Sequence, residues 1–332
     1  MMYSLRNKIN QLFIVGYEGD DVEKCEIFTE LAKNGLGGAI FFTKNIFSPE
    51  QFKKNTDKIK EMSLIAPFLS IDQEGGRVER TENIHNGKKY LSAKDAAAKG
   101  LDFVEKQTEE LCGELLSFGI NMNFAPVLDT NTNPNNPIIG VRAYGDNADD
   151  VIKFATPVFK IHKKMGIIPV GKHFPGHGDT ATDSHLEMPI VKLSREEMAQ
   201  THLKPFKSAI ENGLEAIMVS HVYYTCYDEK PCPASLSENV STKLLKNELS
   251  FDGLVLSDDM VMGAVCNKNP FEIYIQALKA GINVFLYRFS DEKLLSIIDF
   301  IEISAKNDEV LFNKINQSFE NVVKLKHTYK IL

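Results

Sequence analysis

Short apolar runs alternate with longer amphipathic stretches along almost the whole chain, and this alternation constrains the fold more than any other feature. Each run has about four to eight residues, the length of a strand that is buried on both faces of a parallel sheet. The predicted strands lie at residues 11–17, 38–42, 67–71, 120–127, 167–171, 215–220, 253–257 and 282–287.

The stretches between these runs have the periodicity of helices, and several carry start or stop signals. Ser48 places a capping residue before Pro49, and Gly35, Gly213 and Gly281 each follow a predicted helix. Helices are predicted at residues 22–34, 49–62, 92–118, 148–165, 195–212, 237–249 and 270–280.

Eight strands in βα alternation, without a break in composition, predict a single α/β domain over residues 1–332, a (β/α)8 TIM-type barrel. The competing architecture is an open doubly wound sheet. Its usual sign is a Gly-rich phosphate loop, but Gly16–Gly19 does not match the dinucleotide fingerprint and the sequence has no P-loop motif. Residues 292–332 are expected to form one or two extra C-terminal helices outside the barrel.

The net charge of −7 and the pI near 5.7 argue against nucleic-acid and membrane partners. No segment approaches the ~20 apolar residues of a membrane helix, and the apolar patch Leu12–Val15 is too short for a secretion signal. The five cysteines form no CxxC pair, and their odd number favours reduced thiols over a disulfide framework. We therefore expect a cytoplasmic protein.

Polar residues follow five of the predicted strands, at the end of a barrel where catalytic groups are found. Charged groups that directly continue buried strands are costly unless they are paired, so we expect them to converge in one polar cavity. They lie in the segments Asp72–Arg77, Asp129–Arg142, Lys172–His185, Ser220–His221 and Ser257–Asp259.

The segment after the fifth strand is the richest in such groups. It contains His173, His177, His185, Asp179 and Asp183. A metal site is one interpretation, since histidine and aspartate are common ligands. The spacing does not favour it, because the Phe-Pro-Gly sequence between His173 and His177 forbids a helix that would bring them to one face. A turn shaped by the proline and glycines, with histidines at the surface, is the other alternative.

Asp183 and His185 have a more specific interpretation. A carboxylate two positions from a histidine can bond the imidazole and raise its pKa, which gives a proton donor near neutral pH. Asp258, at the tip of a buried run, supplies a rigidly held carboxylate. A nucleophilic carboxylate and a proton donor are the minimum for cleaving a glycosidic bond with retention. The competing interpretation makes Asp258 or Asp259 a cap of the following helix.

Four motifs are distinctive together: Asp72–Val78, Lys172–Thr180, Asp183–His185 and Ser257–Met260. They resemble glycoside hydrolase family 3, and most closely its single-domain bacterial β-N-acetylglucosaminidases of the peptidoglycan-recycling type. The resemblance implies a (β/α)8 barrel without metal or cofactor. It also implies the nucleophile Asp258, the acid/base His185 oriented by Asp183, and a set of sugar-binding residues: Asp72, Arg77, Arg142, Lys172 and His173.

The resemblance thus predicts a retaining exo-β-N-acetylglucosaminidase (β-hexosaminidase) that works through a covalent glycosyl-aspartate. Its predicted partner is a small-molecule sugar, either a muropeptide fragment such as GlcNAc-1,6-anhydro-MurNAc or a chitooligosaccharide. Within the family, the alternatives are a β-glucosidase, a broad aryl-β-glycosidase and a β-GlcNAc phosphorylase. Outside it, the alternatives are a metal-dependent hydrolase and an inactive sugar-binding protein. No sequence pattern predicts an oligomeric state.

Overall fold

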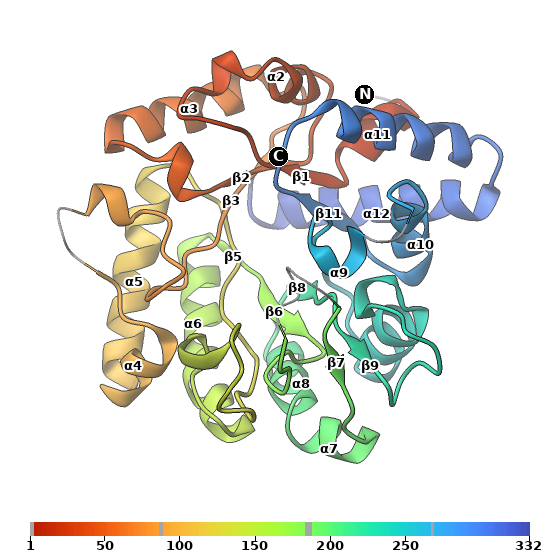
Figure 1. Ribbon diagram of the computed structural model, residues 1–332. Coiled ribbons are helices and arrows are strands. Elements are labelled where there is room, and N and C mark those ends of the chain that lie inside the picture. Colours follow the sequence, from red (N-terminus) through yellow and green to blue (C-terminus); the bar gives the residue numbers. More distant parts are fainter. Residues whose placement is uncertain (1–2, 86–88, 183–187, 267–268) are drawn as a thin grey trace.

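The strands form a parallel barrel, seen in the computed structural model of residues 3–85, 89–182, 188–266 and 269–332 (Figure 1). In spatial order they are β5 (Ile168–Pro169), β4 (Met122–Asn123), β3 (Phe68–Ile71), β2 (Gly38–Phe41), β1 (Phe13–Val15), β11 (Val284–Tyr287), β10 (Leu254–Asp259), β8 (Ala216–Val219) and β6 (Gly171–Phe174). β5 and β6 lie at opposite ends of this order, yet only Val170 separates them in the chain. They are two halves of one interrupted strand, which closes the barrel.

Parallel pairing brings the carboxyl ends of all these strands to one end of the barrel. Residue pairs such as Phe13–Phe285 and Gly171–Ile217 fix the register between neighbouring strands. Every residue of β2 and β3 is buried, as expected for strands covered on both faces. The (β/α)8 prediction is therefore confirmed, with a strand near each of the eight predicted positions.

Helices surround the barrel on its outside (Figure 1). They are α1 (Leu5–Asn10), α2 (Glu26–Lys33), α3 (Pro49–Met62), α4 (Ala93–Ala98), α5 (Leu101–Ser117), α6 (Ala148–Met165), α7 (Arg195–Gln200), α8 (Leu203–Glu211), a π-helix (Asn239–Glu248), α9 (Gly263–Cys266), α10 (Glu272–Ala280), α11 (Glu292–Ala305) and α12 (Glu309–Thr328). The helix predicted over residues 92–118 is wrong as one element, because Gly100 takes a φ of +98° and separates α4 from α5.

Two short strands lie outside the barrel, where β7 (Ile190–Val191) pairs with β9 (Tyr223–Tyr224). The strand predicted to end at residue 171 continues to Phe174, so Lys172 and His173 lie on β6 instead of following it. Both are buried, and they stay on the strand because polar partners inside the barrel satisfy them.

The C-terminal helices pack on the outside of the barrel, as predicted. α12 contacts both α1 and α10. Its Lys326 is fully buried and donates to Gln11 Oε1, to the Gly37 carbonyl and to the Ala66 carbonyl, at 2.7 to 3.0 Å. These acceptors precede β1, β2 and β3, so Lys326 lies at the amino end of the barrel.

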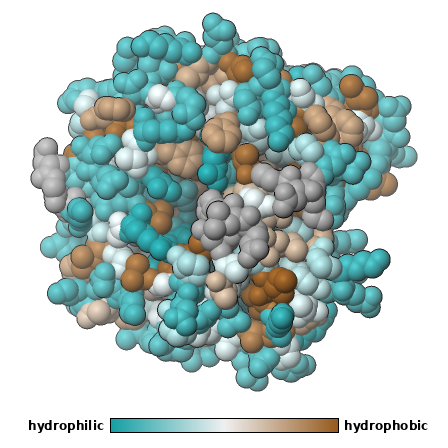
Figure 2. Space-filling view, in the orientation of Figure 1, coloured by the Kyte–Doolittle hydropathy of each residue, from teal (hydrophilic) through white to brown (hydrophobic). Residues whose placement is uncertain are grey.

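The face shown in Figure 2 is largely hydrophilic, with apolar residues in small groups between polar ones. Within the described ranges, no helix combines the length and the apolar composition needed to cross a membrane.

Candidate active site

A cavity of about 340 Å³ lies at the carboxyl end of the strands. It brings together five of the predicted site residues: Asp72, Arg142, Lys172, His173 and Asp258. The rest of its described lining consists of Phe42, Val78, Arg80, Ile138, His177, Met218, Asp259, Met262, Leu286 and Arg288. The polar cavity expected from the strand ends is therefore present.

Glu74 holds the two cations on one wall of this cavity. Lys172 Nζ lies 2.6 Å from Glu74 Oε1 and 2.6 Å from Asp72 Oδ1. Arg142 donates to both carboxylate oxygens of Glu74, at 2.7 and 2.8 Å. Burial raises the pKa of Glu74, but Arg142 and Lys172 outweigh burial and hold that pKa well below its ordinary value. The Glu74 carboxylate therefore fixes both cations beside Asp72.

Asp129 organises the histidines. It is fully buried, and its Oδ2 lies 2.7 Å from His173 Nδ1. Its Oδ1 accepts the backbone N–H of His177 at 2.7 Å. Burial raises the pKa of Asp129, but the nearby histidines lower that pKa by more, so this carboxyl is ionised. The ionised Asp129 accepts a hydrogen bond from Nδ1–H of His173, which leaves Nε2 as an acceptor 3.4 Å from Arg142 Nη2.

His177 is neutral at pH 7, because burial lowers its pKa to about 4. Its Nδ1 lies 2.8 Å from Thr180 Oγ1, and the Thr180 hydroxyl itself donates to the His177 carbonyl at 3.0 Å. Nδ1 therefore carries the proton. Among the described residues, no group of three or more His, Cys, Asp and Glu side chains is arranged to hold a metal ion.

Asp258 lies near the carboxyl end of β10 and is partly exposed to the cavity. Burial raises its pKa, but His173, His221 and the Asp259 N–H together lower it to about 2. That N–H lies 2.7 Å from Asp258 Oδ1. The carboxylate is therefore ionised at neutral pH, as a nucleophile must be.

Asp259 has a different environment from its neighbour. Burial raises its pKa, and its carboxylate pairs with Arg288 and accepts the Val261 N–H at 3.1 Å. The next helix, α9, begins only at Gly263. Among the described residues, the side chains of Asp258 and Asp259 thus contact groups at the strand end and cap no helix.

Arg80, and not the predicted Arg77, lines the cavity. Arg80 lines the cavity with its guanidinium 5.7 Å from the centre of the Phe42 ring. Arg77 is exposed, is not among the lining residues, and donates to the carbonyls of Pro137 and Ile138. The sugar-binding role predicted for Arg77 remains a prediction, and the structure adds Arg80 as a candidate that the sequence did not single out.

Asp183 and His185 lie outside the described residues. Their roles as acid/base pair therefore stay predictions from the sequence. Before them in the chain, Thr180 contacts His177, which lines the cavity.

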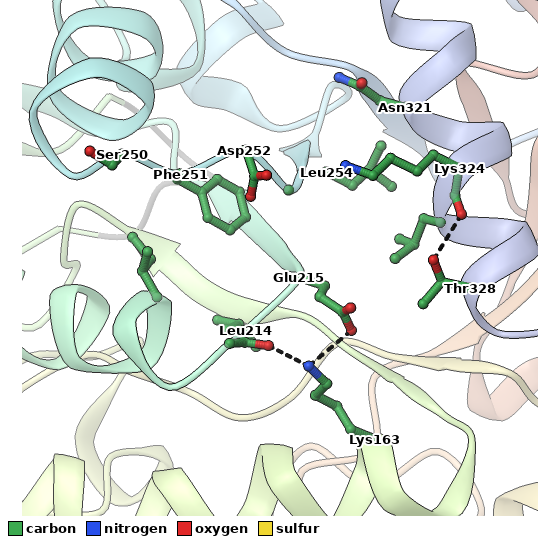
Figure 3. A pocket seen from close by; sticks show the side chains of 14 residues that line it. Lys163, Leu214, Glu215, Ser250, Phe251, Asp252, Leu254, Asn321, Lys324 and Thr328 are labelled. Carbon is green, nitrogen blue, oxygen red and sulfur yellow. Dashed lines mark hydrogen bonds and ion pairs between the residues drawn. The ribbon is translucent and has the colours of Figure 1, made fainter.

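A second cavity, of about 320 Å³, lies at the opposite end of the barrel (Figure 3). It is bordered by the segments that precede β8 and β10 and by α12. Lys163 is already paired there with Glu215 at 3.2 Å and bound to the Gly213 carbonyl at 2.5 Å. In barrels of this kind the amino end serves stability and the carboxyl end carries the chemistry. The first cavity is therefore the candidate active site.

Comparison with known proteins decides the family. The family model described as the glycosyl hydrolase family 3 N-terminal domain matches residues 4–325. The chain belongs to glycoside hydrolase family 3. This confirms the resemblance seen in the four motifs, and it makes the protein a glycoside hydrolase.

The chain matches different shares of the length of its named relatives. Beta-hexosaminidase A of Pseudoalteromonas piscicida is 32% identical, over 91% of this chain but only 55% of that protein. Beta-hexosaminidase of Photobacterium profundum is 32% identical, over 94% of this chain and 92% of that protein. The solved structure of a family 3 β-N-acetylglucosaminidase from Paenibacillus sp. has a TM-score of 0.93 at 33% identity, covering 99% of this chain and 63% of that one. The chain thus spans about half of the first relative and nearly all of the second.

Proposed function

We propose that this family 3 member is a retaining exo-β-N-acetylglucosaminidase, a β-hexosaminidase. The observation that carries the proposal is Asp258, an ionised carboxylate in a cavity that also presents Asp72, Lys172 and Arg142. The names of the relatives, which are β-hexosaminidases and a β-N-acetylglucosaminidase, support the choice of sugar.

Asp258 acts as the nucleophile in this mechanism. Its carboxylate attacks the anomeric carbon and forms a glycosyl-aspartate, while His185 gives its proton to the departing oxygen. His185, oriented by Asp183, then takes a proton from water, whose oxygen displaces Asp258 and releases the sugar. Two displacements at one carbon retain its configuration.

The charged wall recognises the terminal sugar. Asp72 accepts hydrogen bonds from sugar hydroxyls, and Lys172 and Arg142 donate to sugar oxygens while Glu74 holds both cations in place. His173 contributes Nε2, because Asp129 occupies its Nδ1. We take GlcNAc-1,6-anhydro-MurNAc as the natural substrate and the cytoplasm as the location, both on the resemblance of the motifs to the peptidoglycan-recycling subgroup.

Turnover of the 4-nitrophenyl β-glycosides of GlcNAc and glucose, with and without phosphate or EDTA, tests the proposal. We expect turnover of the GlcNAc compound, unaffected by EDTA and by phosphate, with the β-anomer released first in NMR spectra. D258A should retain its circular dichroism spectrum and lose more than about 10⁴-fold in kcat.

Each other outcome contradicts a defined part of the proposal. Preference for the glucoside overturns the choice of sugar, and a phosphate-dependent sugar phosphate overturns water as the acceptor. Loss with EDTA replaces the mechanism with a metal-dependent one. Substantial turnover by D258A removes Asp258 as the nucleophile.

A further inference from the structure

His221 is a buried imidazole beside the site to which the proposed chemistry gives no role. It follows β8 by two residues and is 0% exposed. It is not among the described residues that line the cavity, whereas Met218 of the same strand is. His221 therefore acts on the site through its neighbours and not by contact with a sugar.

Burial lowers the pKa of His221, so the ring is neutral at pH 7, and its hydrogen bonds then fix one tautomer. Nε2 lies 3.1 Å from the backbone carbonyl of Asp259, which can only accept, so Nε2 carries the proton. Nδ1 then accepts from the Ser235 hydroxyl at 2.7 Å. Ser235 is also fully buried and is fixed by its own backbone N–H, which donates to the Ser220 carbonyl at 3.1 Å. The ring is thus held at both nitrogens.

The bond to Asp259 is made beyond the last pair between β10 and β8, on a residue that β10 still pairs with β11. Pairing of β10 with β8 ends at Ser257, and the register with β11 shifts between Leu256 and Asp259. A strand is least constrained by its ladder at such an irregularity. Beyond the last β8–β10 pair, the segment after β8 still contacts β10, because His221 binds the Asp259 carbonyl.

Asp259 in turn controls the carboxylate of Asp258. Its N–H donates to Asp258 Oδ1, its own carboxylate pairs with Arg288, and its carbonyl accepts from His221. The residue next to the nucleophile is therefore held through its N–H, its side chain and its carbonyl, and the carbonyl also accepts the Met262 N–H at 3.0 Å. Loss of the His221 donor loosens the Asp259–Met260 peptide, and rotation of the backbone at Asp259 then moves the N–H that aims Asp258.

We infer that His221 is a positioning residue for the nucleophile: its Nε2–H fixes the Asp259 peptide and so keeps the Asp258 carboxylate aimed at the anomeric carbon. This role rests on the proposed function of Asp258. Among the described residues, the charged and titratable groups that face Asp258 are Lys172 and His173 from β6, His177 after that strand, His221 itself, and Asp259 with its partner Arg288.

The test compares H221L, which loses the donor, with H221Q, whose amide can place an N–H near the position of Nε2. On 4-nitrophenyl β-GlcNAc we expect H221L to lose about 10²-fold in kcat with little change in KM, the effect of a small misplacement of a reacting group. H221Q should recover most of that loss.

The pH profile separates positioning from general damage. The wild-type pKa of Asp258, about 2, leaves kcat/KM level on its acid side down to about pH 4. Asp258 must be ionised, so a raised pKa moves the acid decline to higher pH. In H221L we expect the midpoint of this decline to lie near the ordinary aspartate value of about 4, so that kcat/KM already falls below about pH 5.

Two results with these variants overturn the role. One is an H221L protein with the kcat and the pH profile of the wild type. The other is an equal loss of kcat in H221L and H221Q when both melt at the wild-type temperature. If H221L does not fold, S235A replaces it, with an expected loss of kcat and the same shift of the acid decline. Wild-type behaviour of S235A overturns the role. An inactive wild-type chain instead refutes the proposed function, and the role of His221 falls with it.

Discussion

At the scale of single residues, three cations of the candidate site, Lys172, Arg142 and Arg288, each pair with a carboxylate. Arg80 differs from them. Its guanidinium makes no hydrogen bond or ion pair with a described residue, and its buried Nε has no partner. Among the described residues, the guanidinium instead makes a cation–π contact with the Phe42 ring. A buried donor without an acceptor costs about 1–3 kcal/mol, which a sugar oxygen in the cavity recovers on binding.

Arg80 and Arg77 can therefore be told apart by kinetics. We expect R80M to lose about 10-fold to 100-fold in kcat/KM on the GlcNAc substrate, since it removes a charged donor from the cavity. R77M should lose no more than about threefold, because Arg77 is exposed and binds the carbonyls of Pro137 and Ile138. A larger loss in R77M than in R80M would restore the sugar-binding role to Arg77.

This case also shows what the sequence could predict of the site. Positions at strand ends could be predicted, because parallel strands end together, and so Asp72, Lys172 and Asp258 were correctly expected in one cavity. Positions beyond a turn could not. Gly75 and Val78 bond each other across a tight turn, which sends Arg77 outward and returns the chain so that Arg80 lines the cavity.

At the scale of elements, the barrel could be predicted because each buried strand is an apolar run bounded by helices. The pattern failed where polar residues sit inside a strand, as at Lys172 and His173, whose partners Asp72 and Asp129 are far away in the sequence. It also failed at Gly100, because a glycine within a helical pattern does not reveal that its φ is positive and that the helix ends there. The His221–Asp259 bond had no signal, because it depends on how two separate strand ends meet.

The segment after β6 is an element whose shape depends on close backbone contact. A Cβ atom added to Gly178 would lie 1.7 Å from the Thr130 carbonyl oxygen, so the two backbones cannot keep their positions. We expect G178A to lower both the denaturation midpoint and kcat, by more than about 10-fold for kcat, because it displaces the neighbouring His177.

G113A is the matched control, since Gly113 is an exposed residue of α5 with nothing within 4 Å of an added Cβ. It should raise stability by about 0.5–1 kcal/mol and leave kcat unchanged. Full activity in G178A would show that the backbone contact does not shape the site.

At the scale of the whole molecule, the two ends of the barrel have separate tasks. The carboxyl end holds the cavity with Asp258, and the amino end is tied together by Lys326, which reaches from α12 to acceptors beside three strands. Burial lowers the pKa of Lys326 well below its ordinary value. The three acceptors and the Phe68 ring, 4.7 Å from Nζ, nevertheless provide a partner for each N–H of the ammonium group.

Replacing Lys326 with methionine separates stability from catalysis. K326M spares the burial of an ammonium group, but it leaves Gln11 Oε1 and the Ala66 carbonyl without this donor, and the fixed backbone cannot turn the carbonyl away. The Gly37 carbonyl keeps the Phe68 N–H. The lost hydrogen bonds outweigh the cost of burying the ammonium group, so we expect the free energy of unfolding in urea to fall by roughly 1–3 kcal/mol. Both kcat and KM at 25 °C should stay unchanged, because Asp258 lies at the other end of the barrel.

K324M is the control, since Lys324 is exposed and lies two residues earlier in α12, and it should change neither stability nor activity. A K326M protein as stable as the wild type would mean that packing alone holds α12 against the barrel.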